Sequence, residues 1–100
     1  MFVHAHGTGT PQNRVTESHI LSELCSVFNI NNLPVTGIKS YLGHSLAAAG
    51  GDQVISSIGT FNDKYIPGIK TIPEVADNVY KKNFPIMKYK GLGLGLGLGL

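Results

Sequence analysis

The chain has 100 residues, of which 42% are hydrophobic and 14% charged, and its formal net charge is +2. So small a charge argues against a nucleic-acid partner, and the length allows at most one small domain. No apolar run approaches the roughly 20 residues that span a bilayer, and the amino terminus has no signal-peptide pattern, so we expect no membrane partner. The high apolar fraction predicts surfaces that other polypeptide covers.

The first third of the chain predicts a strand, a turn and a helix. Residues 1–5 form a strand candidate that ends at the turn HGTGTP, where Gly7 and Gly9 allow a sharp bend. Asn13 is a candidate N-cap, because apolar residues recur at helical spacing over about 14 residues after it. The segment NINNLP ends this helix, since Asn and Pro favour turns.

The next segments repeat this order. Residues 34–38 predict a second strand, which leads to the turn KSYLGH at Lys39 to His44. Residues 45–61 have helical spacing and a single charge, Asp52, which predicts a helix buried on most sides. Residues 65–72 are expected to be extended, 73–80 to form a turn or short helix, and 84–89 to form a strand. This order predicts an α/β fold with parallel strands joined by crossovers.

Residues 91–100 repeat the pair Gly-Leu. Glycine at every second position weakens a strand, so we interpret this stretch as a low-complexity tail, with a glycine-rich strand as the alternative. The spacing of its glycines does not match a nucleotide-binding fingerprint.

Two turns carry residues that could perform chemistry. HGTGTP provides His6, and KSYLGH provides Lys39 and His44. Each turn follows a predicted strand, and the carboxyl ends of adjacent strands meet in one crevice, so we expect the three side chains to converge over a common cavity. Imidazole N–H groups aimed at one point can stabilise an oxygen that gains charge during a reaction. Glu17 is the candidate partner that fixes Lys39.

These motifs resemble a known family. HGTGTP, with Glu17 eleven residues after His6, is followed by KSYLGH and AAAGG. This arrangement resembles the carboxyl-terminal half of the β-ketoacyl synthases, the condensing enzymes of fatty acid and polyketide synthesis. The resemblance covers residues 1–90 as a partial domain and leaves 91–100 as the tail. It implies half of a thiolase-like layered αβαβα fold, with a mixed sheet, one buried helix and a homodimer.

The resemblance also implies a decarboxylative Claisen condensation of an acyl thioester with malonyl-acyl carrier protein. His6 and His44 match the family histidines that hold the malonyl thioester oxygen, and Lys39 and Glu17 match its supporting lysine and glutamate. Acyl carrier protein is then the expected partner, its phosphopantetheine the substrate carrier, and no tightly bound cofactor is expected. The residues that match the threonines on the pantetheine arm are Thr8 and Thr10.

The chain also departs from the family pattern. The family nucleophile lies in an upstream half, whereas Cys25 sits on the apolar stripe of a predicted helix, without the electropositive setting of a reactive thiolate. We therefore predict that Cys25 is not the nucleophile and that the chain alone is inactive. A lone cysteine also favours a reducing, cytoplasmic location. Arg14 stands where many family members have an aspartate.

Two other interpretations stay open at this point. The chain could be a non-catalytic remnant that binds acyl carrier protein or dimerises. Alternatively, His4, His6 and His44 could supply three nitrogen ligands to a catalytic zinc ion. Because no carboxylate is placed as a further ligand or second-shell partner, we predict no metal site.

Overall fold

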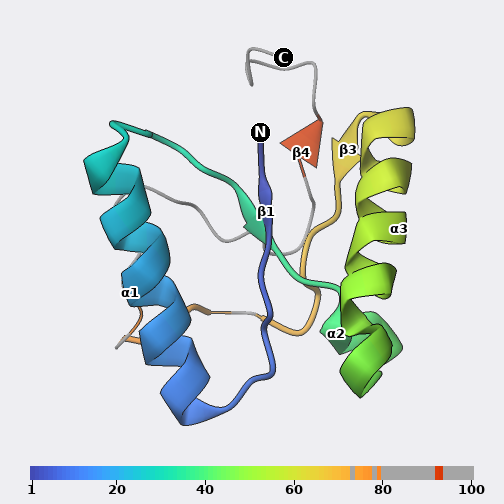
Figure 1. The fold of residues 1–100 in the computed structure, drawn as a ribbon, viewed down its shortest axis with the longest axis horizontal. Coiled ribbons are helices and arrows are strands. Elements are labelled where there is room, and N and C mark those ends of the chain that lie inside the picture. Colours follow the sequence, from blue (N-terminus) through green and yellow to red (C-terminus); the bar gives the residue numbers. More distant parts are fainter. Residues whose placement is uncertain (73, 78, 80–91, 94–100) are drawn as a thin grey trace.

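Two short parallel strands lie between two long helices. The computed structural model describes residues 1–72, 74–77, 79 and 92–93. Figure 1 shows α1 on one side of the strands β1 and β2 and α3 on the other. The α/β class predicted from the order of the elements is therefore confirmed. The elements are β1 (Val3–His4), α1 (Pro11–Val27), β2 (Val35–Thr36), α2 (Lys39–Leu42), a 3-10 turn (Leu46–Ala48), α3 (Ala49–Asp63), β3 (Tyr65–Ile66) and β4 (Leu92–Gly93).

The strands β1 and β2 run parallel, with Val3 opposite Val35 and His4 opposite Thr36. A backbone hydrogen bond from Ala5 N–H to the Thr36 carbonyl, 2.7 Å long, continues the pairing toward the carboxyl ends. The helix α1 forms the connection between the two strands. Because the strands point the same way, the segments that follow them leave the sheet at the same edge.

Successive side chains of the first strand segment point to opposite faces, so some pack toward α1 and others toward α3. Val3 and Ala5 pack against the core cluster, which α1 and the segment around β2 supply. Phe2 instead contacts Phe61 of α3, with ring centroids 5.5 Å apart. Gln53 of α3 also donates a 3.0 Å hydrogen bond to the Ala5 carbonyl. Both helices are therefore attached to β1. The buried cluster consists of Leu21, Cys25, Leu33 and Val35.

The helix α1 begins earlier than the sequence analysis predicted. Thr10 is its N-cap, and the Thr10 hydroxyl accepts a 3.4 Å hydrogen bond from Asn13 N–H. Pro11 occupies the first helical position, where its missing N–H has no intrahelical partner to lose. The prediction of Asn13 as the cap is therefore wrong, because Asn13 lies inside the first turns of the helix.

The helix α3 is exposed along one side. Within it only Ala49 and Thr60 are buried. The predicted helix buried on most sides is thus not found in the described part of this chain, because a pair of two-residue strands covers only one side of α3. The apolar side chains of α3 that are more than half exposed are Val54, Ile55, Ile58 and Phe61, with exposed fractions of 60%, 71%, 56% and 54%.

The carboxyl-terminal part adds a second, antiparallel strand pair. Tyr65 lies opposite Gly93 and Ile66 opposite Leu92, so two residues of the Gly-Leu repeat form the strand β4. At these two residues, the pairing agrees with the alternative interpretation of the repeat as a glycine-rich strand. Among the described residues of 73–80, Glu74 lies in a bend and Asp77 in a turn, and none is helical. The strand predicted at 84–89 lies outside the described residues. In the described part, no helix is both long and apolar enough to cross a membrane.

Candidate active site

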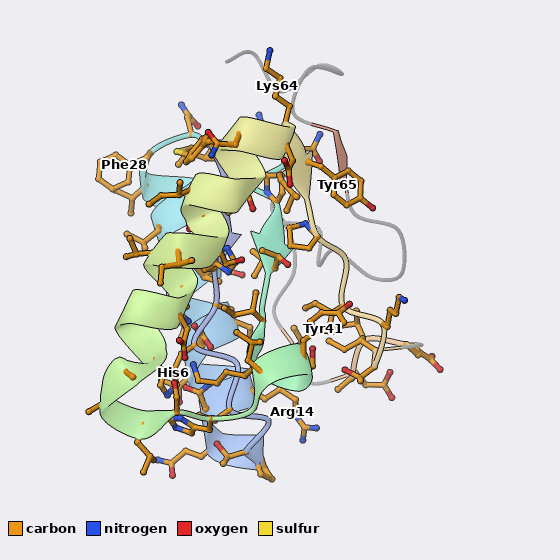
Figure 2. The ribbon with its side chains drawn as sticks, turned by 90° about the vertical axis from the view of Figure 1, so that its right-hand side faces the viewer. His6, Arg14, Phe28, Tyr41, Lys64 and Tyr65 are labelled. Carbon is orange, nitrogen blue, oxygen red and sulfur yellow. The ribbon has the colours of Figure 1, made fainter. Side chains whose placement is uncertain are left out.

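The imidazole rings of His6 and His44 face each other edge to plane. Their centroids are 5.6 Å apart, and the ring planes are inclined by 88°. His6 follows β1, whereas His44 follows α2, the short helix after β2. Figure 2 shows His6 at the same end of the molecule as Arg14, away from Lys64 and Tyr65 at the other end. The predicted convergence of the two rings is therefore confirmed.

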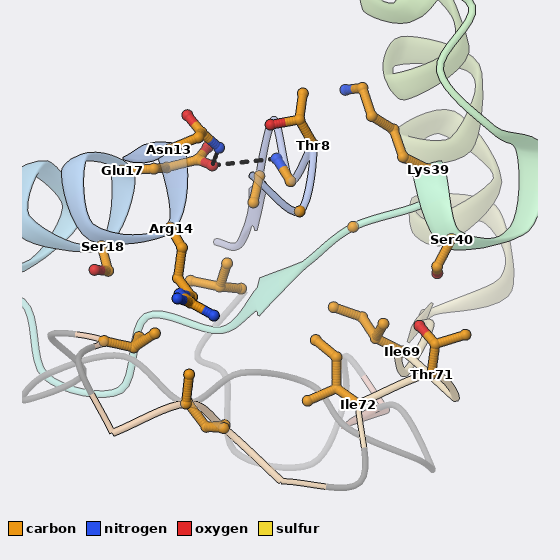
Figure 3. A pocket seen from close by; sticks show the side chains of 18 of the residues that line it. Thr8, Asn13, Arg14, Glu17, Ser18, Lys39, Ser40, Ile69, Thr71 and Ile72 are labelled. Carbon is orange, nitrogen blue, oxygen red and sulfur yellow. Dashed lines mark hydrogen bonds between the residues drawn. The ribbon is translucent and has the colours of Figure 1, made fainter. Parts of the chain in front are cut away.

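The backbone around His6 is held by the carboxylate of Glu17. One carboxylate oxygen accepts a 2.6 Å hydrogen bond from His6 N–H, and the other accepts a 3.1 Å bond from Gly7 N–H. The second oxygen also accepts a 3.0 Å bond from the Asn13 side-chain amide (Figure 3). Hydrogen bonds to an ionised carboxylate are stronger than those between neutral groups. Glu17 therefore fixes the turn that carries His6.

Lys39 holds the same residue from its other side. Its ammonium donates a 2.6 Å hydrogen bond to the His6 carbonyl. The predicted pairing of Lys39 with Glu17 is wrong, because no ion pair joins them in the described residues. Both Glu17 oxygens already accept backbone N–H groups. The two charged side chains therefore act on His6 together, one through its N–H and the other through its carbonyl.

The orientation of His44 depends on its own neighbours in the chain. Leu46 N–H donates a 3.1 Å hydrogen bond to His44 Nδ1. A nitrogen that accepts a hydrogen bond carries a lone pair, so the neutral ring has its proton on Nε2. Gly43, at φ 81° and ψ −177°, adopts a conformation that is almost restricted to glycine. Leu46 has a positive φ of 53°.

The two threonines of the first turn differ in role. Their hydroxyl oxygens lie 3.3 Å apart, within hydrogen-bond distance. Thr10 also caps α1, so its hydroxyl already has a structural task. Thr8 lines a cavity beside the turn, whereas Thr10 is not among the lining residues. Thr8 is therefore the better placed of the two for contact with a bound molecule.

A cavity of about 540 Å³ lies next to these residues (Figure 3). Its polar lining includes Thr8, Lys39 and His44. His6 does not line it. The ring of His6 instead lies beside that of His44, which does line the cavity, so a single cavity faced by both imidazoles stays a prediction.

His4 is set apart from this pair. Its ring contacts Phe2, with centroids 5.4 Å apart, and neither ring nitrogen has a hydrogen-bond partner among the described residues. Burial lowers the pKa of His4, because the charged imidazolium loses hydration there. In the described residues, no three His, Cys, Asp or Glu side chains are grouped so that they could hold a metal ion.

Cys25 lies in the core between α1 and the strands, with an exposed fraction of 1%. Burial raises the pKa of the Cys25 thiol, because the thiolate would lose its hydration. A buried thiol with a raised pKa is a poor nucleophile. This environment supports the prediction that Cys25 does not carry the acyl group.

Sequence reasoning missed the part played by two amides. Asn13 supports the Glu17 carboxylate, and the i, i+4 spacing of the two on one helix could have indicated this contact. Gln53 binds the Ala5 carbonyl, one residue before His6. No pattern in the sequence could have indicated that bond, because it joins a side chain to a backbone group far away in the chain.

Comparison with known proteins places this geometry in a family. Residues 1–72 match the family described as "Beta-ketoacyl synthase, C-terminal domain". The chain belongs to the β-ketoacyl synthase family. The family resemblance stated from the motifs HGTGTP and KSYLGH is therefore confirmed.

The match to other β-ketoacyl synthases extends to a solved structure. The chain is 56% identical over 85 residues to the β-ketoacyl-[acyl-carrier-protein] synthase FabY of Pseudomonas aeruginosa, covering 85% of this chain and 13% of that protein. The crystal structure of the ketosynthase FabY superimposes with a TM-score of 0.89 at 52% identity, over 92% of this chain and 14% of FabY. A 3-oxoacyl-[acyl-carrier-protein] synthase 2 of Synechocystis is 30% identical over 66 residues, 66% of this chain and 16% of that protein. The chain thus spans a small part of each of these relatives.

Proposed function

We propose that this chain supplies two histidines and a lysine to a decarboxylative Claisen condensation between an acyl thioester and malonyl-acyl carrier protein. The observation that carries the proposal is the edge-to-plane contact of His6 and His44 at 5.6 Å, with Lys39 bound to the His6 carbonyl. Family membership supports the reaction class, and the names of the relatives include β-ketoacyl and 3-oxoacyl synthases that act with an acyl carrier protein.

The histidines act on the malonyl thioester oxygen. His44 Nδ1 accepts the Leu46 N–H, so its Nε2–H is the group that can donate to a substrate. When carbon dioxide leaves, the electrons of the broken carbon–carbon bond pass to the α-carbon and the thioester oxygen. Imidazole N–H groups stabilise the charge that develops on this oxygen. The α-carbon then attacks the acyl thioester and releases the cysteine thiolate.

Lys39 and Glu17 are positioning residues in this scheme. Glu17 binds His6 N–H and Gly7 N–H, and Lys39 binds the His6 carbonyl. Together they limit the backbone positions that His6 can occupy. A fixed donor stabilises a transition state without the cost of reorganising at the moment of reaction.

The carrier and the nucleophile come from outside this chain. We infer that Thr8 and Thr10 contact the pantetheine arm of acyl carrier protein, whose phosphopantetheine carries the substrate, and that no other cofactor is bound tightly. Since Cys25 is buried, the nucleophilic cysteine belongs to the other half of the synthase. That half would cover the exposed apolar side of α3 and complete a layered αβαβα fold, which forms a homodimer in the cytoplasm.

Replacement of the histidines tests the proposal in the full-length protein. His6→Ala and His44→Ala are each expected to reduce condensation and malonyl decarboxylation about 100-fold or more, because each removes a positioned donor. The control is His19→Ala on the exposed side of α1, which should leave both rates unchanged.

Two results would contradict this assignment. Near-normal turnover in either active-site variant would remove His6 or His44 from the reaction. A wild-type protein that folds and binds acyl carrier protein, yet never decarboxylates its malonyl group, would instead favour the non-catalytic remnant.

A further inference from the structure

The residue that follows His44 is tied to the helix α3. The Ser45 hydroxyl donates a hydrogen bond to a carboxylate oxygen of Asp52, seven residues further along the chain. Ser45 is the N-cap of the 3-10 turn, yet its side chain makes no capping hydrogen bond to that turn. A serine N-cap commonly accepts a hydrogen bond from the helical backbone that follows it. Here the hydroxyl instead joins the turn to α3.

Asp52 is itself fixed in the fold. It lies in the first turn of α3, where the positive end of the helix dipole favours the ionised carboxylate. The next residue, Gln53, donates the 3.0 Å hydrogen bond to the Ala5 carbonyl, so this part of α3 is attached to the chain one residue before His6. In the described residues, the Asp52 carboxylate forms no ion pair, and Ser45 is its hydrogen-bond partner.

Ser45 stands between the ring of His44 and the group that orients this ring. His44 Nδ1 accepts the Leu46 N–H, and these two residues flank Ser45 in the chain. Leu46 has a left-handed φ of 53°, which is unfavourable for a residue with a side chain. The contribution of a hydrogen bond to an ionised carboxylate is of the same order as that cost. The bond from Ser45 to Asp52 can therefore hold the turn in the conformation that aligns Leu46 N–H with His44.

We propose that Ser45 and Asp52 are positioning residues for His44. Their hydrogen bond keeps Leu46 N–H on Nδ1 and so keeps the proton of the neutral ring on Nε2, the nitrogen that donates in the proposed function. The consequence for the reaction rests on that function, whereas the consequence for the ring does not. Without the bond the turn relaxes, Leu46 N–H leaves Nδ1, and the ring is free to turn and to change its tautomer.

Malonyl decarboxylation by the full-length protein tests the consequence for the reaction. Asp52→Ala and Ser45→Ala are each expected to lower kcat about tenfold, the value of one hydrogen bond to a charged group, with little change in KM. The double variant should be no slower than Asp52→Ala, because both changes remove the same bond. Ser45→Thr retains a hydroxyl and should restore the rate. Asp63→Ala removes an exposed acid at the other end of α3 and is the matched control, with the kcat of the wild type.

The state of the ring is tested separately with diethyl pyrocarbonate, which modifies an unprotonated imidazole nitrogen. In the wild type this nitrogen of His44 is Nδ1, which accepts the Leu46 N–H, so His44 should react slowly. Asp52→Ala and Ser45→Ala should each accelerate its modification by about the factor that they remove from kcat, because both populate the relaxed turn. Peptide mass spectrometry measures the rate, and His19 on α1 is the internal reference, whose rate should not change.

Two results would overturn the proposal. One is modification of His44 at the wild-type rate in both single variants, and the other is a double variant whose loss in kcat is the product of the two single losses. Ser45→Ala lies on an exposed turn and keeps the test decisive if Asp52→Ala does not fold. A wild-type protein that never decarboxylates its malonyl group would contradict the proposed function, whereas the modification rates of His44 would still decide whether Asp52 holds its ring.

Discussion

The turn that carries His6 and the segment that carries His44 are held in different ways. His6 is fixed by Glu17 of α1 and Lys39 of α2, which bind its N–H and its carbonyl. His44 is fixed by the N–H of Leu46, two residues further along the chain. One ring thus depends on contacts across the fold, whereas the other depends on local backbone conformation. Different substitutions should therefore disturb each ring.

The largest effect should come from breaking the contacts across the fold. Glu17→Ala leaves His6 N–H and Gly7 N–H without their carboxylate partner. We expect a loss of about 1–3 kcal/mol in the free energy of unfolding and a fall of about 100-fold in condensation. Denaturant unfolding and a condensation assay of the full-length protein measure both.

A matched acid on the same helix provides the control for Glu17. Glu23→Ala removes an exposed carboxylate that contacts only His19 among the described residues, so both quantities should stay near wild type. Equal rates in the two variants would mean that Glu17 does not position His6.

The local conformation at His44 is tested by Gly43→Ala. Gly43 has φ 81° and ψ −177°, so an added methyl group is strained even though it meets no atom within 4 Å. We expect a cost of about 1–3 kcal/mol in the free energy of unfolding. Gly37→Ala is the control, since its new methyl group would have only ordinary contacts, at 3.8 Å and 4.0 Å. Similar unfolding midpoints for the two variants would contradict the strain at Gly43.

A smaller effect of opposite sign is expected one turn later. Leu46, at φ 53°, is 75% exposed in this chain. Leu46→Gly should relieve about 1–2 kcal/mol of left-handed strain, offset by about 0.5–1 kcal/mol of lost backbone entropy. The expected net gain in the free energy of unfolding is then about 0–1.5 kcal/mol. The control is Leu42→Gly in α2, where no left-handed strain is relieved, so this variant should be less stable than the wild type. If calorimetry shows that both variants are less stable than the wild type, the explanation for Leu46 is wrong.

The weakest effect concerns His4, which neither arrangement uses. Burial lowers the pKa of His4 from 6.5, so below pH 6.5 the unfolded chain binds a proton that the folded chain resists. Stability should therefore fall as the pH decreases through 6.5 toward the folded pKa, and it should be unaffected above that range. His4→Leu removes this part of the pH dependence, whereas His19→Gln on the exposed side of α1 retains it. Unfolding curves at several pH values that are identical for wild type and His4→Leu would contradict the prediction.

The sequence predicted the path of the chain better than its contacts. The convergence of His6 and His44 followed from two strand-to-turn motifs, because parallel strands end at one edge. The hydrogen bond from Lys39 to the His6 carbonyl could not be predicted in this way. Every residue has a backbone carbonyl, so no residue type in the sequence marks the acceptor. The start of α1 could have been predicted from the sequence, because threonine at the N-cap followed by proline at the first helical position is a common helix start.

The burial predicted for α3 is not confirmed in this chain, for another reason. A helix with one charge was expected to be buried, yet Ile55 and Phe61 are more than half exposed, at 71% and 54%. The composition of a helix indicates that an apolar face should be buried. It does not indicate which polypeptide segment buries that face. The same limit applies to the cavity lining, where Arg14 and Ile72 come from distant parts of the chain.

The open apolar side of α3 bears on the biosynthesis of the protein. The exposed side chains of Val54, Ile55 and Ile58 can associate with other exposed hydrophobic surfaces. If this helix is synthesised before the polypeptide that covers it has folded, the exposed side chains favour aggregation or prolonged binding to chaperones. Bacterial overproduction of this segment by itself should therefore yield inclusion bodies, and co-translation with its cover should restore soluble yield.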